Sequence, residues 1–494
     1  MTLARRLTTE RLMLGILFIL LFVIAVRVPV DTDTWWHLRS GNYILNEGKI
    51  PQTDPFSHTK NGEAWIDHSW GGQVIMTLAY RLTGGSGNID DSGVIGLALY
   101  TAILGTAGML CVYRMCEGSI YSKAFVMVFG AASAAVFWSP RPQMLSFFLS
   151  AAVLYILHLY KREALDRLWL IPVMMIFWVN LHGGFAIGFI LLILFIIGEI
   201  IGNLLNPADP DAIGWRGVQK LTLITVVSLA ALAINPYGIR MIWYPFDTAG
   251  LQTLNVFIQE WQSPDFKLPQ TWAFVILLLS TFGFALLTNN RPAWSDISLV
   301  LGTLLLSLWA GRNIATFAVV TTPVLSRLVD HFLTERGWQI RPTRKMTTPK
   351  ALINVALLTL IALSGLLKVV ADLTPRNVQD IQADLMPINA IAYLQENPPQ
   401  GNLFNSYNWG GLLMFVLPDH PVFVDGRTDL YGDDFLKEYF HAYLGGSKWQ
   451  EPLDKYHVQT VILEKETALS TLLREEEGWE IVYEDKQAVI FVHE

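Results

Sequence analysis

The chain has 494 residues, of which 52% are hydrophobic and only 16% are charged. Its mean hydropathy is +0.38, whereas about a quarter of the residues of a soluble domain are charged. This composition excludes an ordinary soluble protein. The formal net charge of −7 argues against nucleic acid as a partner. We therefore expect an integral membrane protein.

About eleven apolar stretches approach or reach the roughly 17–25 residues that a helix needs to cross a bilayer. They cover residues 12–30, 92–113, 122–138, 143–160, 168–180, 184–204, 220–235, 271–288, 295–310, 313–330 and 351–371. The first is long for a signal peptide, and no small-residue cleavage site closes it, so we predict that it is retained. The expected fold class is an α-helical polytopic membrane protein.

The basic residues predict how the chain is oriented, because cytoplasmic loops are rich in Lys and Arg. Arg5, Arg6 and Arg11 place the N-terminus in the cytoplasm. Every second loop after it is basic, and these loops carry Arg114, Lys123, Lys161, Arg162, Arg167, Arg216, Lys220, Arg291, Arg336, Arg341, Arg344, Lys345 and Lys350. We predict a multi-pass protein of the plasma (inner) membrane whose C-terminus lies outside.

Three segments become external in this topology: a loop over residues 31–70, a loop over 235–270, and the tail 374–494 that follows a transmembrane domain over 1–373. The tail alternates helix-like pieces with short strand-like runs, which predicts a small α/β domain. The expected helices cover 387–395, 434–443 and 467–474, and the expected strands cover 421–424, 458–463, 479–483 and 488–492.

The first external loop begins with Asp31-Thr32-Asp33, directly after the first span. Two carboxylates at this spacing can reach one point. They suit a hard divalent cation such as Mg²⁺ or Mn²⁺, which prefers carboxylate oxygens. One of them could instead take a proton from an acceptor hydroxyl as a general base. The structural alternative is that they mark the end of the span and cap the next helix.

The same loop is dense in aromatic and polar residues. Its tryptophans are Trp35, Trp36, Trp65 and Trp70. They fit an interfacial aromatic belt, and tryptophan also stacks on the apolar faces of sugars. His37, Asp67 and His68 add polar groups. Because the histidines lack a zinc-binding spacing, we expect them to bond to the loop backbone or to orient a carboxylate.

Further polar groups lie at the external ends of other spans. Arg141 and Arg312 oppose the positive-inside trend, which is typical of anion-binding groups, although snorkelling toward lipid headgroups is the alternative. His182 lies at a break between two apolar segments, and Glu260 stands beside a tryptophan in the second external loop.

The tail has its own polar cluster around Asp425-Gly426-Arg427. Asp425 and Arg427 are candidates for donor or acceptor recognition. The alternative is that Arg427 simply pairs with Asp429.

These motifs together resemble the GT-C superfamily of polytopic glycosyltransferases, which includes oligosaccharyltransferases and protein O-mannosyltransferases. The resemblance is carried by D-x-D-T-W-W-H-L after the first span, by P-x-x-D-P-F-S and by W-x-D-H-x-W. Later segments of bacterial members look like NLHGG, NPYG, EW-x-S-P and D-G-R-x-D-x-Y, all of which occur here.

The resemblance implies a transferase that uses a polyprenyl-phosphate-linked sugar and an acidic residue of the first external loop. By position, Asp33 or Asp31 would be the catalytic or metal-linked carboxylate. The acceptor would be a glycan, lipid or protein hydroxyl, and the reaction would invert the anomeric centre. The W-W-D motif of oligosaccharyltransferases is absent and YNWGG stands in its place, so recognition of an Asn-containing sequon is not implied.

Two other functions fit the composition. One is a transporter or flippase for a lipid-linked substrate, but transporters carry ionisable groups near the middle of spans and show repeated segments. Here the polar groups gather at the external ends and no repeat is evident. The other is an assembly or anchoring subunit that uses the tail as a binding module.

Overall fold

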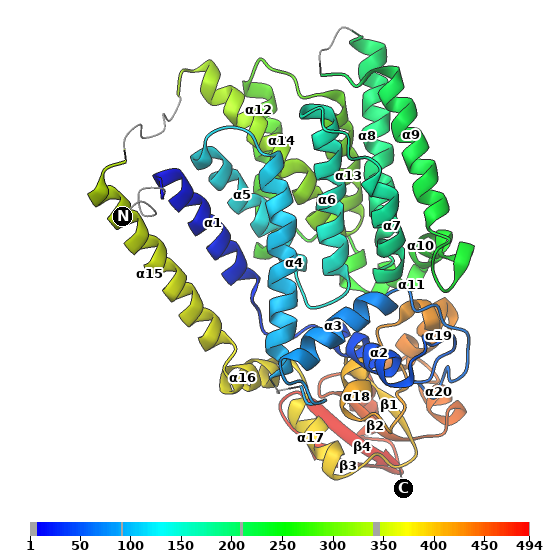
Figure 1. Ribbon diagram of the computed structural model, residues 1–494. Helices are drawn as coiled ribbons and strands as arrows, with labels where there is room; N and C mark the ends of the chain where they lie inside the picture. Colours follow the sequence, from blue (N-terminus) through cyan, green and yellow to red (C-terminus); the bar gives the residue numbers. More distant parts are fainter. Residues whose placement is uncertain (1–6, 90–91, 208–210, 339–345, 494) are drawn as a thin grey trace.

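The computed structural model describes residues 7–89, 92–207, 211–338 and 346–493; Arg5, Arg6, Arg341, Arg344 and Lys345 lie outside this part. Each predicted apolar stretch forms a helix. These helices are α1 (Thr9–Ala25), α4 (Gly93–Met115), α5 (Ile120–Ala134), α6 (Gln143–Arg162), α7 (Leu170–Leu181), α8 (Phe185–Leu205), α9 (Gly214–Ala231), α12 (Trp272–Leu287), α13 (Trp294–Trp309), α14 (Ile314–Glu335) and α15 (Thr348–Asp372). They run roughly alongside one another as a bundle (Figure 1).

Within the described residues, six helices are long and apolar enough to cross a membrane, namely α4, α6, α8, α15 and the helices that begin at Ile120 and Pro269. Many large apolar side chains of the bundle point outward, including Leu279, Leu286 and Leu305. Lipid tails are as apolar as leucine, so such a surface is stable only within a bilayer. Only 11% of the α15 span is buried by the rest of the protein. The protein is an integral membrane protein.

The first external loop folds into two helices that pack on each other, α2 (Asp33–Glu47) and α3 (Trp70–Leu82). They lie at one end of the bundle (Figure 1). Trp35, Trp36 and Trp65 are buried in this packing, so these three do not form the interfacial belt that their number predicts. They pack instead against the tail and against one another, as in the contact of Trp35 with Phe415.

The second external loop contains only short helical segments. They are η3 (Gly238–Ile242), α10 (Tyr244–Ala249), α11 (Gln252–Phe257), η4 (Gln259–Trp261) and η5 (Pro269–Thr271). The N–H groups of Gln252 and Thr253 donate to the carboxylate of Asp433, at 3.0 and 2.9 Å. The loop is thereby fixed to the tail.

The tail is a mixed α/β unit. Its helices are α16 (Pro375–Leu385), α17 (Ile388–Glu396), α18 (Gly410–Val416), α19 (Thr428–Tyr443), α20 (Gln450–Lys455) and α21 (Ala468–Leu473). Its strands β1 (Asn402–Asn405), β2 (Val458–Glu464), β3 (Trp479–Glu484) and β4 (Ala488–His493) form a sheet in the order β1-β2-β4-β3. Only the β1–β2 pair is parallel.

One predicted strand is wrong. Residues 421–424 do not join the sheet, although their apolar pattern is strand-like. Val422 forms a single parallel bridge with Ser57 of the first external loop, so this extended segment pairs with the loop instead. α18 also packs on α2. The first loop and the tail are therefore one packed unit at the end of the bundle (Figure 1).

Candidate active site

A cavity of about 840 Å³ lies where the bundle, the first loop, the second external loop and the tail meet. Its lining includes Asp31, Asp33, Trp36, His37, His68, Arg141, His182, Glu260 and Arg312. Nine of the twelve site residues that the sequence singles out therefore share one cavity. Apolar side chains of the bundle, such as Phe147, Ile187 and Val319, line its other parts.

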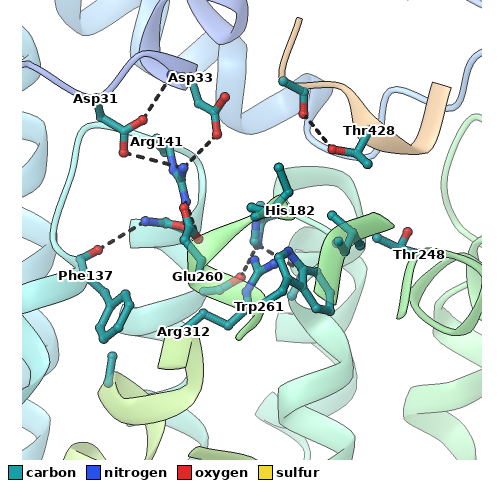
Figure 2. A pocket seen from close by; sticks show the side chains of 18 of the residues that line it. Asp31, Asp33, Phe137, Arg141, His182, Thr248, Glu260, Trp261, Arg312 and Thr428 are labelled. Atoms are coloured by element: carbon teal, nitrogen blue, oxygen red, sulfur yellow. Dashed lines mark hydrogen bonds and ion pairs between the residues drawn. The ribbon is translucent and has the colours of Figure 1, made fainter. Parts of the chain in front are cut away.

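Arg141 is the centre of a cluster of carboxylates (Figure 2). Its Nη1 lies 2.8 Å from Asp33 Oδ2 and 3.5 Å from Asp31 Oδ2, and its Nη2 lies 2.8 Å from Glu260 Oε1. In the sequence, Arg141 stands between Pro140 and Pro142, whose rings restrict the backbone just before α6. One buried cation thus faces three carboxylates.

Asp31 and Asp33 play different local parts. The N–H of Asp33, the first residue of α2, donates to Asp31 Oδ1 at 3.0 Å. Asp31 therefore closes the turn between the span and α2, but it does not cap this helix, whose N-cap is Thr32 without a side-chain cap bond. The Oδ1 of Asp33 accepts from Trp36 Nε1 at 3.3 Å, while its Oδ2 faces Arg141.

Burial raises the pKa of Asp33 to about 7; Arg141 opposes this rise, while Asp31 and Glu260 add to it. Burial works against ionisation of Glu260 as well, but Arg141 and Arg312 bring the pKa of Glu260 below its ordinary value. Near neutral pH, Asp33 is therefore the carboxylate of this cluster that can both lose and take up a proton.

Arg312 differs from Arg141 in having no carboxylate partner. Its guanidinium stacks over the ring of Trp261, 4.4 Å from the ring centroid, and it makes no ion pair or hydrogen bond to any residue that the structure describes. Burial lowers the pKa of Arg312, yet a guanidinium stays charged in proteins. The cavity therefore holds a cation that is open to an anion.

Three histidines line the cavity. His37 stacks on Trp36 with 3.6 Å between ring centroids, and its Nδ1 lies 3.4 Å from Gln73 Nε2. His68 contacts Tyr244, and His182 contacts Ser146. Burial is the main cause that lowers the pKa of each histidine.

The three remaining predicted residues lie behind the cavity wall. Asp425 and Arg427 are 0% and 1% exposed and pair with each other at 2.7 Å. Arg427 Nη1 also pairs with Asp54 Oδ1 at 2.6 Å, which ties the tail to the first loop. Asp67 is 0% exposed and accepts from Gln73 Nε2 at 2.7 Å. Buried and bonded in this way, these groups do not face the cavity.

The alternative pairing of Arg427 with Asp429 is also wrong. Because Arg427 pairs with Asp425 and Asp54, Asp429 is left to line the cavity. Tyr244 and Tyr407 join it there. The alternation Asp425, Arg427, Asp429 could have indicated that the last carboxylate faces a different way. Tyr407 belongs to the YNWGG segment that the sequence singles out, whereas Tyr244 carries no such signal.

In the described ranges, no group of three or more His, Cys, Asp or Glu side chains has the arrangement of a metal site. The three carboxylates that come together do so around the guanidinium of Arg141.

No family model matches the sequence, and no curated protein matches it. Solved structures do. The archaeal oligosaccharyltransferase AglB from Archaeoglobus fulgidus, in complex with an inhibitory peptide and a dolichol-phosphate, aligns with a TM-score of 0.59 at 13% identity, covering 91% of this chain and 69% of that one. AglB tethered to an acceptor peptide with the NVT sequon aligns at 0.56 and 12% identity, covering 97% and 74%.

A bacterial enzyme aligns over nearly its whole length. ArnT from Cupriavidus metallidurans in the apo state has a TM-score of 0.51 at 13% identity, and the alignment covers 96% of this chain and 95% of that one. AglB and ArnT are both GT-C membrane glycosyltransferases. The chain therefore has the GT-C fold that the motifs of its first external loop predict.

Proposed function

We propose that this protein is a membrane glycosyltransferase that moves a sugar from a polyprenyl-phosphate donor to an acceptor hydroxyl. The carrying observation is that Asp33, with a pKa of about 7, and Arg312, a cation without a carboxylate partner, line the same cavity. The fold supports the donor class, since AglB carries a dolichol-phosphate in its solved structure.

In the proposed step, ionised Asp33 takes the proton of the acceptor hydroxyl, and the hydroxyl oxygen attacks the anomeric carbon. The bond between that carbon and the phosphate oxygen breaks, and the lipid phosphate leaves with the electron pair. Attack and departure on opposite faces invert the anomeric centre. Trp36 and Arg141 fix the two oxygens of Asp33, so the base needs little reorganisation to act.

The leaving phosphate belongs at Arg312 rather than at Arg141. Three carboxylates already surround Arg141, and this surplus of negative charge would repel a phosphate. Arg312 lines the same cavity, and its guanidinium fork has no ion pair or hydrogen bond to the residues that the structure describes. Such a fork matches phosphate oxygens and stabilises the charge that develops as the donor bond breaks.

A divalent ion does not fit the carboxylates as they stand. Asp31, Asp33 and Glu260 direct oxygens at the guanidinium of Arg141, which occupies the point where an ion would bind. The proposed step therefore needs neither Mg²⁺ nor Mn²⁺. Transfer measured with EDTA and with each added ion tests this directly, and a strict requirement for either ion would contradict the assignment of Arg141 as the local cation.

The experiment for the function is transfer from radiolabelled polyprenyl-phosphate sugars in proteoliposomes. Asp33→Asn should reduce turnover by about 10²–10⁴-fold, the range for loss of a general base. Asp454→Asn, on the exposed face of α20, is the matched control. Full activity of Asp33→Asn would refute the mechanism. Movement of the donor across the vesicle membrane without turnover would instead identify a flippase.

A further inference from the structure

His68 and His182 lie on the cavity wall, and the proposed transfer step uses neither of them. His68 precedes α3, and His182 follows α7 at the break before α8. Their ring centroids are 5.9 Å apart. The Nε2 atom of each ring has no hydrogen-bond partner in the part of the chain that the structure describes. Figure 2 shows His182 in the cavity with Arg312 and Trp261.

The neighbours of His182 determine which ring nitrogen carries its hydrogen. The backbone N–H of Gly184 donates to His182 Nδ1 at 3.0 Å. The indole N–H of Trp178 donates to Ser146 Oγ at 2.7 Å, which leaves the Ser146 hydroxyl hydrogen for His182 Nδ1 at 2.8 Å. Backbone and indole N–H groups can only donate, so Nδ1 is an acceptor. The hydrogen is on Nε2, which is a donor toward the cavity.

His68 is also bonded through Nδ1. Tyr244 Oη lies 2.5 Å from His68 Nδ1, and Asp429 lines the same cavity. A tyrosine hydroxyl and a neutral imidazole nitrogen can each donate or accept, so this contact permits either tautomer of His68. In the tautomer with the hydrogen on Nδ1, His68 donates to Tyr244 and its Nε2 is a bare acceptor, the complement of His182.

Both rings stay neutral near pH 7. Burial lowers the pKa of His68 to about 3, and Arg312 acts in the same direction. Burial, His68 and Arg312 lower the pKa of His182 as well. The acidic groups on the same cavity wall are Asp33, Glu260 and Asp429.

Two glycines hold this arrangement in place. A Cβ on Gly183 would lie 3.0 Å from Tyr244 and 3.1 Å from His68. A Cβ on Gly184 would lie 2.6 Å from Ser146 Oγ and 2.7 Å from His182 Nδ1. Side chains at these positions would push the rings out of place. The His182-Gly183-Gly184 sequence thus permits the close approach that the hydrogen bonds need.

We propose that His68 and His182 form a neutral donor–acceptor pair that binds the hydroxyl groups of a sugar. A hydroxyl both donates and accepts, so two neighbouring hydroxyls satisfy one donor and one acceptor. A phosphate at pH 7 mainly accepts and would meet the bare nitrogen of His68 unfavourably. The pair therefore complements Arg312, with the phosphate at the arginine and the sugar at the histidines. This inference rests on the proposed function.

The test uses the full chain in lipid nanodiscs. The probes are polyprenyl phosphate and the same lipid carrying each of a panel of hexoses and pentoses. His68→Ala and His182→Ala should each weaken binding of the preferred sugar-bearing lipid about tenfold, and leave binding of sugar-free polyprenyl phosphate unchanged. Arg312→Ala should weaken both probes. His331→Ala, at the other end of α14, is the control, and melting curves confirm that each variant is folded.

The outcomes distinguish the sugar of the donor lipid from a sugar acceptor. If the variants bind every lipid probe as the wild type does but have a raised KM for a sugar acceptor, the histidine pair binds the hydroxyls of the acceptor. Two results would instead identify the pair as a cationic phosphate site and show that the inference is wrong. One is that the histidine variants bind sugar-free polyprenyl phosphate more weakly than the wild type. The other is that the wild type, but not the variants, binds this lipid more tightly at lower pH. The inference is also wrong if the wild type binds sugar-bearing and sugar-free lipid with equal affinity and the histidine variants do the same.

The same measurements keep the two proposals apart. A wild type that binds neither lipid and transfers no sugar contradicts the proposed function itself. A wild type that binds and transfers, with histidine variants that match it in both assays, contradicts only the histidine pair.

Discussion

At the scale of single residues, the charge on Arg141 sets the behaviour of Asp33. Burial alone makes a carboxyl reluctant to ionise, and Asp31 and Glu260 add to this. Arg141 opposes all three and brings the pKa of Asp33 back to about 7. The base form needed for transfer therefore increases as the pH rises through about 7.

Arg141→Gln should consequently shift the pH profile of transfer toward alkaline pH. Without the cation the pKa of Asp33 rises further, by roughly one unit or more, so turnover at pH 7 falls and part of it returns at pH 9. Initial rates between pH 5.5 and 9.5 measure this. Arg376→Gln, an exposed arginine of α16, should leave the profile unchanged. An unshifted profile in Arg141→Gln would show that Asp33 is not the titrating base.

The buried carboxyl of Asp67 should make the stability of the protein depend on pH. Burial raises the pKa of Asp67 to about 7, so the folded state favours the protonated carboxyl. The protonated carboxyl therefore makes its full contribution to the free energy of unfolding at pH values below the pKa of an ordinary aspartate. This contribution is lost as the pH rises from there through about 7.

Asp67→Asn removes the ionisation and keeps an oxygen for Gln73. The variant should be more stable than the wild type at pH 8, on the order of 2–4 kcal/mol at 1.36 kcal/mol per pKa unit, with a smaller gain at pH 5. Thermal unfolding in detergent at both pH values measures the difference. Asp419→Asn, which is exposed, is the control. An equal gain at both pH values would mean that the ionisation of Asp67 has no effect.

At the scale of elements, the start of α2 and the turn before α19 meet at Gly426. A Cβ on Gly426 would lie 2.1 Å from Asp33 Oδ1 and 3.1 Å from Trp36 Nε1. The neighbouring Arg427 forms ion pairs with Asp54 and Asp425, which restrict movement of this turn away from Asp33. Asp33 would have to move instead.

We therefore expect Gly426→Ala to reduce transfer at least tenfold while costing about 1–3 kcal/mol of stability, the usual range for overpacking. Gly283→Ala, on α12 with open space around it, should affect neither. Turnover and melting temperature of the purified variants test the pair. Retention of full activity by Gly426→Ala would show that the tail does not position Asp33.

The elements also show what the sequence could predict. Each apolar stretch became a helix, because an apolar run in lipid must satisfy its backbone hydrogen bonds internally. The strand expected over 421–424 failed because its partner is Ser57 in a distant loop, and hydropathy patterns do not reveal partners. Likewise, Arg141 meets Asp33 across 108 residues and Glu260 across 119. The motifs indicated these residues individually, but only the packing brings them together.

At the scale of the whole molecule, the cavity lies at the end of the bundle that carries the first loop and the tail. The basic loops predict that this end is external. Charged clusters at the opposite end of the bundle, such as Arg327 with Asp296 at 2.7 Å, would then lie near the cytoplasmic face.

Cysteine labelling tests this orientation. In a background of Cys111→Ala and Cys116→Ala, Lys486→Cys in the tail should react with a membrane-impermeant maleimide in intact cells. Arg291→Cys, in the loop after α12, should react only after the membrane is opened. The reverse pattern would place the cavity on the cytoplasmic side and contradict the predicted topology.

Because the cavity wall joins Asp33, near the beginning of the chain, to Asp429, close to its end, the site cannot exist while the protein is being synthesised. A ribosome-bound chain already has its first spans in the bilayer, yet it lacks the turn that supports Asp33. A chain that ends before Asp429 therefore lacks part of the cavity wall and cannot carry out the transfer that we propose.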